Sequence, residues 1–217
     1  IGEMALIINE MGWIKDSKRI QLNIIPMVNW EREMWFEDTQ LPWKNITPHL
    51  ESPASLLAYS GMDLFRGTNL NIGFGTGAPY MVVGSPWLST SYLLRKLKEQ
   101  NLPGVTFKEI EYRPSGSTYY KRVPKFDNLK CSGIKLIIID QDIFKPIETA
   151  TAILIFIDQL FPRQFQWEEN NYIDKLFGSN ELRILAAQQK NPDHLPALWS
   201  REVYKFNEFR QSFLIYK

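Results

Sequence analysis

A glycine-rich stretch in the middle of the chain, FRGTNLNIGFGTGAPYMVVGSPWL at residues 65–88, constrains the fold more than any other feature. It contains five glycines and two prolines, which disfavour the interior of a helix or a sheet. We therefore expect consecutive turns here, with a short strand at residues 80–85. Regular helices and longer strands must lie on either side of this stretch.

The remaining segments alternate between helical and strand patterns of apolar residues. Helices are predicted at residues 2–11, 53–61, 90–101, 147–161 and 195–216, with two short helices within 171–189. Further strands are predicted at residues 20–29, 105–114 and 131–140. Short strands interleaved with helices and long loops predict an α+β fold, a mixed α/β arrangement in which helices pack on a short mixed sheet.

Composition excludes several classes of function. The 217 residues carry a net charge of +1 with no basic stripe, so we expect no nucleic-acid partner. The single cysteine, Cys131, lies beside an apolar run and is interpreted as a small buried hydrophobic residue rather than a catalytic thiol. No paired metal-ligand spacing is present, and we expect neither a metal nor a cofactor. No apolar run reaches the roughly 18 residues that a membrane span needs.

The glycine-rich stretch allows three interpretations. Phosphate binding is disfavoured, because GFGTG at residues 73–77 precedes a strand rather than a helix and lacks Gly-Lys-Ser/Thr. The glycines can instead serve only to allow turns with positive φ. Alternatively, Thr68 and Asn69 offer a hydroxyl and an amide to sugar hydroxyls, and the glycines let the backbone approach a sugar ring. The residues alone leave the last two interpretations open, and the aromatic content of 13% suits either sugar binding or a large aromatic core.

Several segments resemble the family of NamZ-type exo-β-N-acetylmuramidases, first catalogued as domain of unknown function 1343 and now glycoside hydrolase family 171. YSGMDLFRGTNLNIGFGTGAPYMVVGSPWL is similar to the family signature Y-P-G-x-C-L-F-E-G-T-N-x-S-x-G-R-G-T-x-x-P-F-x-x-x-G-A-P-W. Four further stretches of the chain resemble family segments and follow the same order, namely IIPMVNWEREMWFEDTQLPW, CSGIKLIIIDQDIFKP, YIDKLFGSNELR and FRQSFLIYK. The resemblance therefore spans nearly the whole chain.

The resemblance implies a two-domain plan, in which a Rossmann-like N-terminal domain and a smaller C-terminal α/β domain flank a sugar cleft. Residues 1–20 would be the tail of the preceding domain or an interdomain linker, and residues 21–217 would be the C-terminal domain. The chain starts at Ile1, and we expect the Rossmann-like domain to lie outside it.

The implied activity is release of non-reducing terminal β-N-acetylmuramic acid from peptidoglycan fragments. The acid/base carboxylate is expected in the missing domain, so we predict no catalytic residue in this chain and no activity of the chain alone. The expected partners are a peptidoglycan-derived saccharide and the N-terminal domain. The resemblance favours a periplasmic or secreted location and leaves a cytoplasmic one open.

Three positions depart from the family signature. Arg66 stands where many members have Glu, Phe74 where they have Arg, and Asn71 where they have Ser. An arginine in such a cleft can hold the lactyl carboxylate of muramic acid in a bidentate pair, and Arg66 could replace the family arginine in this role. These departures leave an alternative function open, namely a noncatalytic carbohydrate-binding or interaction module of a divergent relative.

The predicted substrate-binding residues are Arg66, Thr68, Asn69, Gly73, Gly75, Thr76, Trp35 and Tyr119. Trp35 is a candidate sugar platform near the acidic pair Glu37-Asp38, and Tyr119 lies where family members carry a Lys-Tyr/His loop. Glycosidases usually place two carboxyl groups around the scissile bond. The candidates for a second carboxyl group are Glu37, Asp38 and Asp63, with solvated turn residues as the alternative interpretation.

Overall fold

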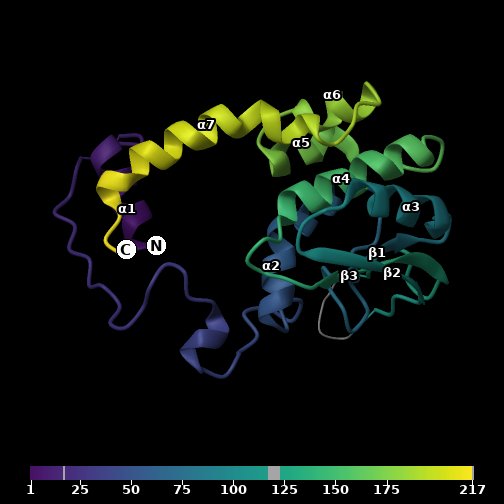
Figure 1. The fold of residues 1–217 in the computed structure, drawn as a ribbon, viewed down its shortest axis with the longest axis horizontal. Helices are drawn as coiled ribbons and strands as arrows, with labels where there is room; N and C mark the ends of the chain where they lie inside the picture. The colour runs from purple at the N-terminus through teal and green to yellow at the C-terminus, as the bar shows by residue number, and fades with distance from the viewer. Residues whose placement is uncertain (17, 117–122, 217) are drawn as a thin grey trace. The chain divides into compact units, whose positions relative to one another are not determined.

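The computed structural model describes residues 1–16, 18–116 and 123–216, and Figure 1 shows its helices and strands. The chain divides into two compact units. The first unit consists of residues 1–42 together with 197–217, and the second consists of residues 43–196. Helix α7 (His194–Arg210) begins in the second unit and ends in the first.

The second unit contains the sheet and most of the helices. Its strands are β1 (Val82–Ser85), β2 (Val105–Tyr112) and β3 (Cys131–Ile138). Its helices are α2 (Pro53–Met62), α3 (Thr90–Gln100), α4 (Pro146–Leu160), α5 (Tyr172–Phe177) and α6 (Glu181–Ala187), with short 3-10 helices η2 (Asp63–Gly67) and η3 (Glu169–Asn171). The α+β fold and the approximate positions of α2 to α6 and of the three strands are as predicted from the sequence, whereas η2 and η3 were not predicted.

The sheet is small, and both of its strand pairs are antiparallel, in the order β1-β3-β2, where the sequence led us to expect a mixed sheet. Gly84 of β1 lies opposite Gly133 of β3. A Cβ atom at Gly84 would lie 2.4 Å from the carbonyl oxygen of Ser132, and one at Gly133 would lie 2.3 Å from that of Val83. The two glycines therefore permit a backbone approach that no other residue allows.

Helix α4 forms the centre of the hydrophobic core. Its residues Thr149 to Ile157 are all buried, and the helix contacts α2, α3 and α6 (Figure 1). A helix without a polar face is stable only when neighbouring elements surround it. The contact with α2 is close, because a Cβ atom at Gly61 would lie 2.1 Å from the carbonyl oxygen of Pro146. In the described part of the chain, no helix has the length and apolar character needed to cross a membrane.

Cys131 is fully buried at the start of β3, which confirms its interpretation as a small hydrophobic residue. Burial raises the pKa of its thiol to about 11. The thiol is therefore protonated at neutral pH and is not a nucleophile in this structure.

The first unit is held together by Glu3 of helix α1 (Gly2–Met11). Its Oε1 accepts hydrogen bonds from Nη2 of Arg32 (2.6 Å), the backbone N–H of Ile215 (2.9 Å) and that of Tyr216 (3.3 Å). The hydrogen bond from Arg32 is the main reason why the pKa of Glu3 falls to about 2. A single carboxylate thus connects α1, the loop that contains Arg32, and the segment after η4 (Gln211–Phe213).

The predicted strand at residues 20–29 is wrong, because the structure has neither a strand nor a helix in this segment. The loop that contains it includes only the short helix η1 (Phe36–Thr39). The prediction rested on apolar and β-branched residues, but a strand is stable only when it pairs with other strands. The described residues of the first unit include no strand with which the segment could pair.

Candidate functional site

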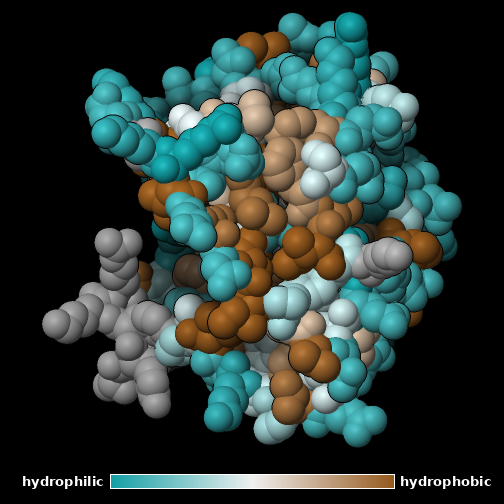
Figure 2. Space-filling model, turned by 90° about the vertical axis from the view of Figure 1, so that its left-hand side faces the viewer, coloured by the Kyte–Doolittle hydropathy of each residue, from teal (hydrophilic) through white to brown (hydrophobic). Residues whose placement is uncertain are grey.

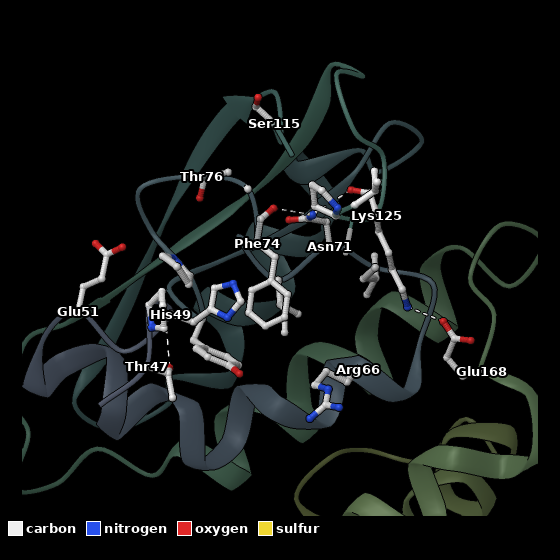
Figure 3. A pocket seen from close by; sticks show the side chains of 18 of the residues that line it. Thr47, His49, Glu51, Arg66, Asn71, Phe74, Thr76, Ser115, Lys125 and Glu168 are labelled. Carbon is white, nitrogen blue, oxygen red and sulfur yellow. Dashed lines mark hydrogen bonds and ion pairs between the residues drawn. The ribbon is translucent and has the colours of Figure 1, made fainter. Parts of the chain in front are cut away.

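An open cavity of about 1650 Å³ lies in the second unit (Figure 3). Its walls come from the loop at 45–51, Arg66 at the end of η2, the loop at 70–80, residues 115 and 123–125 after β2, and residues 168–175 of η3 and α5. Small-molecule sites in proteins are typically cavities of about 300–1,000 Å³. The cavity is therefore larger than a typical small-molecule site.

Two glycines give the 70–80 loop its shape. Gly73 and Gly75 both have a φ of 80°, a backbone conformation that favours glycine. A Cβ atom at Gly73 would lie 2.3 Å from the carbonyl oxygen of Ala78, and one at Gly75 would lie 2.8 Å from the backbone nitrogen of Ser115. Gly75 also accepts a backbone hydrogen bond from Ser115 (2.8 Å). The two glycines are therefore needed for the turn and for its contact with the segment after β2.

Asn71 fixes the base of this loop and is itself buried. Its Nδ2 donates to the carbonyl oxygens of Phe74 (3.1 Å) and Lys125 (2.9 Å). Its Oδ1 accepts from the backbone N–H of Gly73 (2.8 Å) and from the hydroxyl of Tyr112 (3.3 Å). Burial raises the pKa of Tyr112, which keeps this hydroxyl protonated as a donor. One amide thus connects two walls of the cavity to the sheet.

Aromatic rings form a flat part of the cavity wall (Figure 3). The rings of His49 and Phe74 are stacked, with centroids 3.9 Å apart and planes 10° apart. The ring of Tyr80 meets that of Phe74 edge-on at 5.2 Å, and its hydroxyl donates to Oδ1 of Asp63 (3.3 Å). Burial lowers the pKa of His49, which favours its neutral form at neutral pH. The stack therefore presents an uncharged ring surface.

In Figure 3, the charged side chains of Arg66, Lys125 and Glu168 lie to the right of the ring stack, and Glu51 lies to its left. Arg66 contacts Oδ2 of Asp63 through Nη1 (3.3 Å) and the hydroxyl of Tyr172 through Nη2 (3.4 Å). Its side chain remains 43% exposed, so further donors are available to a ligand. Lys125 pairs with Glu168 and also donates to the carbonyl oxygen of Thr68. The cavity thus combines an apolar ring surface with a positioned guanidinium group.

A family model described as exo-beta-N-acetylmuramidase NamZ, C-terminal, matches residues 57–216. The chain belongs to the NamZ family. The N-terminal model of the same family matches residues 1–54. The two matches meet within residues 54–57, whereas the sequence led us to expect the boundary between residues 20 and 21. That division stays a prediction.

Similar proteins extend this comparison. The chain is 28% identical over 216 residues to the peptidoglycan beta-N-acetylmuramidase NamZ of Bacillus subtilis (strain 168), with 100% of the chain and 50% of the relative covered. It thus spans about half the length of this curated relative. Two solved structures of DUF1343 family proteins from Bacteroides fragilis NCTC 9343 match all of the chain, with TM-scores of 0.86 and 0.74. Their identities are 22% and 21%, and 56% and 55% of their chains are covered.

The structure brings together three of the predicted substrate-binding residues of this NamZ family chain. Arg66, Gly75 and Thr76 all line the cavity. Gly73 belongs to the same loop but is buried beneath it. Thr76 turns its hydroxyl toward the loop, where it donates to the carbonyl oxygen of Gly73 (2.6 Å) and accepts from the backbone N–H of Ala78 (3.1 Å).

Thr68 and Asn69 do not line the cavity. Thr68 is fully buried, and its hydroxyl donates to the carbonyl oxygen of Phe65 (2.8 Å) and accepts from the backbone N–H of Leu70 (3.2 Å). Asn69 donates through Nδ2 to the carbonyl oxygen of Gln164 (2.8 Å) and accepts at Oδ1 from the backbone N–H of Gln166 (3.1 Å). Both side chains therefore form hydrogen bonds with backbone groups of the protein in this structure.

The other predicted residues lie elsewhere. Trp35 belongs to the first unit, where it immediately precedes η1. Tyr119 lies outside the described residues. Sequence reasoning did not select His49 or Asn71 as site residues. Asn71 carried a recognisable signal, because an asparagine two residues before a glycine is typical of a side-chain-capped turn, but the position of His49 depends on a tertiary contact.

The candidate carboxyl groups have structural partners or lie apart from the cavity. Asp63 binds Arg66 and Tyr80. Asp38 accepts from the backbone N–H of Trp35 (2.7 Å), and Glu37 lies beside it in η1. Within the described ranges, no group of three or more His, Cys, Asp or Glu side chains is placed to hold a metal ion.

Proposed function

We propose that this chain is the C-terminal portion of a glycoside hydrolase that releases non-reducing terminal β-N-acetylmuramic acid from peptidoglycan fragments. In this proposal, the cavity of the second unit forms one side of the substrate cleft. The observation that carries the proposal is the match of the NamZ C-terminal family model to residues 57–216. The peptidoglycan beta-N-acetylmuramidase of Bacillus subtilis, which aligns with the whole chain, supports it.

The ring surface is proposed to bind the apolar face of a sugar. His49 and Phe74 both line the cavity and are half-buried, and the ring area that their stack leaves uncovered would complement the C–H groups of a pyranose. Neutral His49 adds this area without the cost of desolvating a charge. The 70–80 loop lies beside this surface, so that the exposed Gly77 and the backbone around it can approach the ring closely.

Arg66 is proposed to bind the lactyl carboxylate that distinguishes muramic acid from glucosamine. Its guanidinium group is held by Asp63 and Tyr172 but keeps part of its surface exposed in the cavity. Arginine pairs with carboxylates through parallel hydrogen bonds, which fixes orientation as well as affinity. This role would compensate for Phe74, which stands where many family members have arginine.

The chemical step requires a proton donor for the glycosidic oxygen. We propose that this group comes from the N-terminal domain of the family and that the present chain only positions the sugar. The chain is accordingly expected to bind the saccharide without cleaving it.

The proposal is tested with a chromogenic β-N-acetylmuraminide. The chain is assayed alone and as part of a polypeptide that also carries the N-terminal half of the Bacillus subtilis relative. We expect release only from the longer polypeptide. Release from the corresponding β-N-acetylglucosaminide, without release from the muraminide, would refute the proposed specificity.

The alternative is a noncatalytic carbohydrate-binding module, which the changes at Arg66 and Phe74 favour. The same assay separates the two, because a binding module gives no release in either form. Calorimetric titration of the chain with N-acetylmuramic acid then decides whether saccharide binding is retained.

A further inference from the structure

Two surfaces of this chain are candidates for contact with a ligand or partner. Large apolar side chains are exposed, among them Ile25 at 88% and Val28 at 83%, and Figure 2 shows hydrophobic side chains gathered in the middle of one face. An apolar surface alone does not select one chemical class of ligand, whereas a few precisely placed polar groups do. The cavity of the second unit has such groups, because Asp63 joins two of its walls through hydrogen bonds.

The short helix η2 places Asp63 and Arg66 on the same face. A 3-10 helix has about three residues per turn, so side chains three positions apart lie directly above one another. Oδ2 of Asp63 accordingly lies 3.3 Å from Nη1 of Arg66. The side chain of Asp63 is 20% exposed and does not line the cavity, whereas Arg66 does. Asp63 therefore contacts the guanidinium group without taking a place in the cavity wall.

The other carboxylate oxygen of Asp63 is attached to a fixed point. Its Oδ1 accepts a hydrogen bond from the hydroxyl of Tyr80 (3.3 Å), and burial raises the pKa of Tyr80, which keeps this hydroxyl protonated. Tyr80 is buried and has a φ of 62°, which bulky residues rarely adopt and which persists only where the surroundings impose it. The rings of Tyr59 and Phe74 meet the Tyr80 ring edge-on, at centroid separations of 5.0 and 5.2 Å. Tyr80 thus ties Asp63 to the ring surface.

Arg66 keeps donors for a ligand after these contacts are made. Its Nη1 meets Asp63 and its Nη2 meets the hydroxyl of Tyr172 (3.4 Å), and a guanidinium group has more N–H donors than these two contacts use. Arginine is among the side chains with the most rotamer freedom, and ordering it costs binding free energy. An arginine that is held before the ligand arrives loses less freedom on binding.

We infer that Asp63 is a positioning residue for carboxylate recognition, which holds the guanidinium group of Arg66 in a fixed place relative to the ring surface. One carboxylate contacts both Arg66 and Tyr80, so the separation of the two binding groups is set before a ligand enters. A sugar whose ring lies against His49 and Phe74 then presents its acidic substituent to Arg66 in one orientation. This inference rests on the proposed function, because it takes the ligand of Arg66 to be a sugar carboxylate.

The negative charge of Asp63 also repels a ligand carboxylate, and the exposure of the pair decides which effect is larger. Arg66 is 43% exposed, so water screens the charges around it. Screening weakens the repulsion between the two carboxylates, whereas the rotamer freedom of an unsupported arginine does not depend on the dielectric. We therefore expect positioning to outweigh repulsion.

The experiment measures the Kd of N-acetylglucosamine divided by the Kd of N-acetylmuramic acid, by calorimetric titration of the chain. Asp63→Asn keeps the shape of the side chain and an oxygen acceptor for Tyr80 but removes the charge that holds Arg66. We expect the ratio to fall at least about fivefold. General loosening of the site weakens both sugars and cancels in the ratio. Asp63→Glu retains the charge and should restore most of the preference.

A double-variant cycle shows whether Asp63 acts through Arg66. In the Arg66→Gln background, Asp63→Asn should change the ratio by less than about twofold. Asp174→Asn is the matched control, because it breaks an Asp174–Arg183 pair (2.6 Å) whose residues do not line the cavity, and it should leave the ratio unchanged.

Tyr80→Phe keeps the inference testable if Asp63→Asn does not fold. It removes only the hydroxyl that anchors Asp63 and makes no change at Arg66. The ratio should fall in the same direction, by a smaller factor than with Asp63→Asn.

The possible failures are distinguishable. If the parent chain binds neither sugar, or both equally, the proposed function fails and this inference fails with it. If the parent prefers N-acetylmuramic acid and Asp63→Asn retains that preference, only this inference fails. A rise in the ratio would show that Asp63 competes with the ligand for Arg66, and an equal fall in the Arg66→Gln background would show that Asp63 acts elsewhere. Either result would overturn the positioning role.

Discussion

Asn71 connects two walls of the cavity through the hydrogen bonds of a single side chain. Its amide joins the turn at residues 73–74 to Lys125, and Tyr112 of the sheet donates to the same amide. A buried amide with every partner in place orders its neighbourhood, because each partner would otherwise remain desolvated and unpaired. The shape of the cavity therefore depends on this residue, although its side chain is buried.

We predict that Asn71→Ala destabilises the chain by about 1–3 kcal/mol, because the buried Gly73 N–H and the Lys125 carbonyl lose their partner. Urea unfolding followed by tryptophan fluorescence measures the change. The exposed Asn23 provides the control, since Asn23→Ala should change stability by less than about 0.5 kcal/mol. Equal effects of the two variants would contradict the role assigned to Asn71.

Gly75 and Gly77 lie two residues apart in the same loop but differ in their surroundings. Gly75 has positive φ and is in contact with Ser115, whereas a Cβ atom at Gly77 would meet nothing within 4 Å. We predict that Gly75→Ala lowers stability by about 1–3 kcal/mol and that Gly77→Ala is nearly neutral. Thermal unfolding of the two variants tests this, and a neutral Gly75→Ala would show that the loop can relax.

Arg66 offers a prediction on binding rather than stability. Loss of a hydrogen bond to a charged group costs about 1.5–3 kcal/mol, so Arg66→Gln should raise the Kd for N-acetylmuramic acid about tenfold or more. Binding of N-acetylglucosamine, which has no carboxylate, should not change. Calorimetry with both sugars measures this, and the exposed Arg163, which does not line the cavity, supplies the control Arg163→Gln. If Arg66→Gln weakened the binding of both sugars equally, Arg66 would not be the residue that recognises the carboxylate.

Sequence alone selected part of the cavity lining, and it missed other lining residues for physical reasons. Arg66, Gly75 and Thr76 were selected, and they line the cavity. Thr68 and Asn69 have the same donor and acceptor groups as sugar-binding residues, but the sequence does not reveal that neighbouring backbone groups already satisfy them. The stack of His49 on Phe74 joins residues that are distant in the chain, so no local pattern could predict it.

Elements whose signals are local were predicted well. Ser52 accepts a hydrogen bond from the backbone of Ser55, and Pro53 is the first helical residue, so the start of α2 is encoded in adjacent residues. The segment at 20–29 carries an equally clear strand pattern but has no partner strand in the described part of its unit. Helices close their own hydrogen bonds, whereas strands depend on residues elsewhere, and this difference explains both outcomes.

The contact between helices α2 and α4 supplies a prediction at the level of secondary-structure elements. A Cβ atom at Gly61 would overlap with the carbonyl oxygen of Pro146, so Gly61→Ala must push the two helices apart. Overpacking of this kind costs about 1–3 kcal/mol. Urea unfolding measures the loss, and Ser60→Ala, at the exposed neighbouring position, should stay within about 0.5 kcal/mol of the parent. If both variants unfolded like the parent, the helix contact would be looser than described.

At the scale of the molecule, Glu3 makes the first unit sensitive to acid. Its pKa is lowered to about 2 in the folded chain from an ordinary value of 4.5. The carboxylate therefore contributes stability above about pH 4.5, and this contribution is lost progressively as the pH falls toward 2. Protonation removes the acceptor that binds Arg32, Ile215 and Tyr216.

We predict that Glu3→Gln lowers the melting temperature at pH 7 and flattens its dependence on pH between about 4.5 and 2. Glu10→Gln is the matched control, because Glu10 lies in the same helix and its ion pair with Arg19 is exposed. Scanning calorimetry across this range gives both quantities. The prediction fails if the two variants show the same pH profile.

The hydrogen bonds of Glu3 also set an order of assembly during translation. The second unit, residues 43–196, is continuous in sequence and precedes the last turns of α7. It can therefore fold while the rest of the chain is still being synthesised. Helix α1 must wait until Ile215 and Tyr216 have left the ribosome before its carboxylate finds all of its donors. Although α1 precedes the whole second unit in sequence, it is thus among the last elements of this chain to complete its contacts.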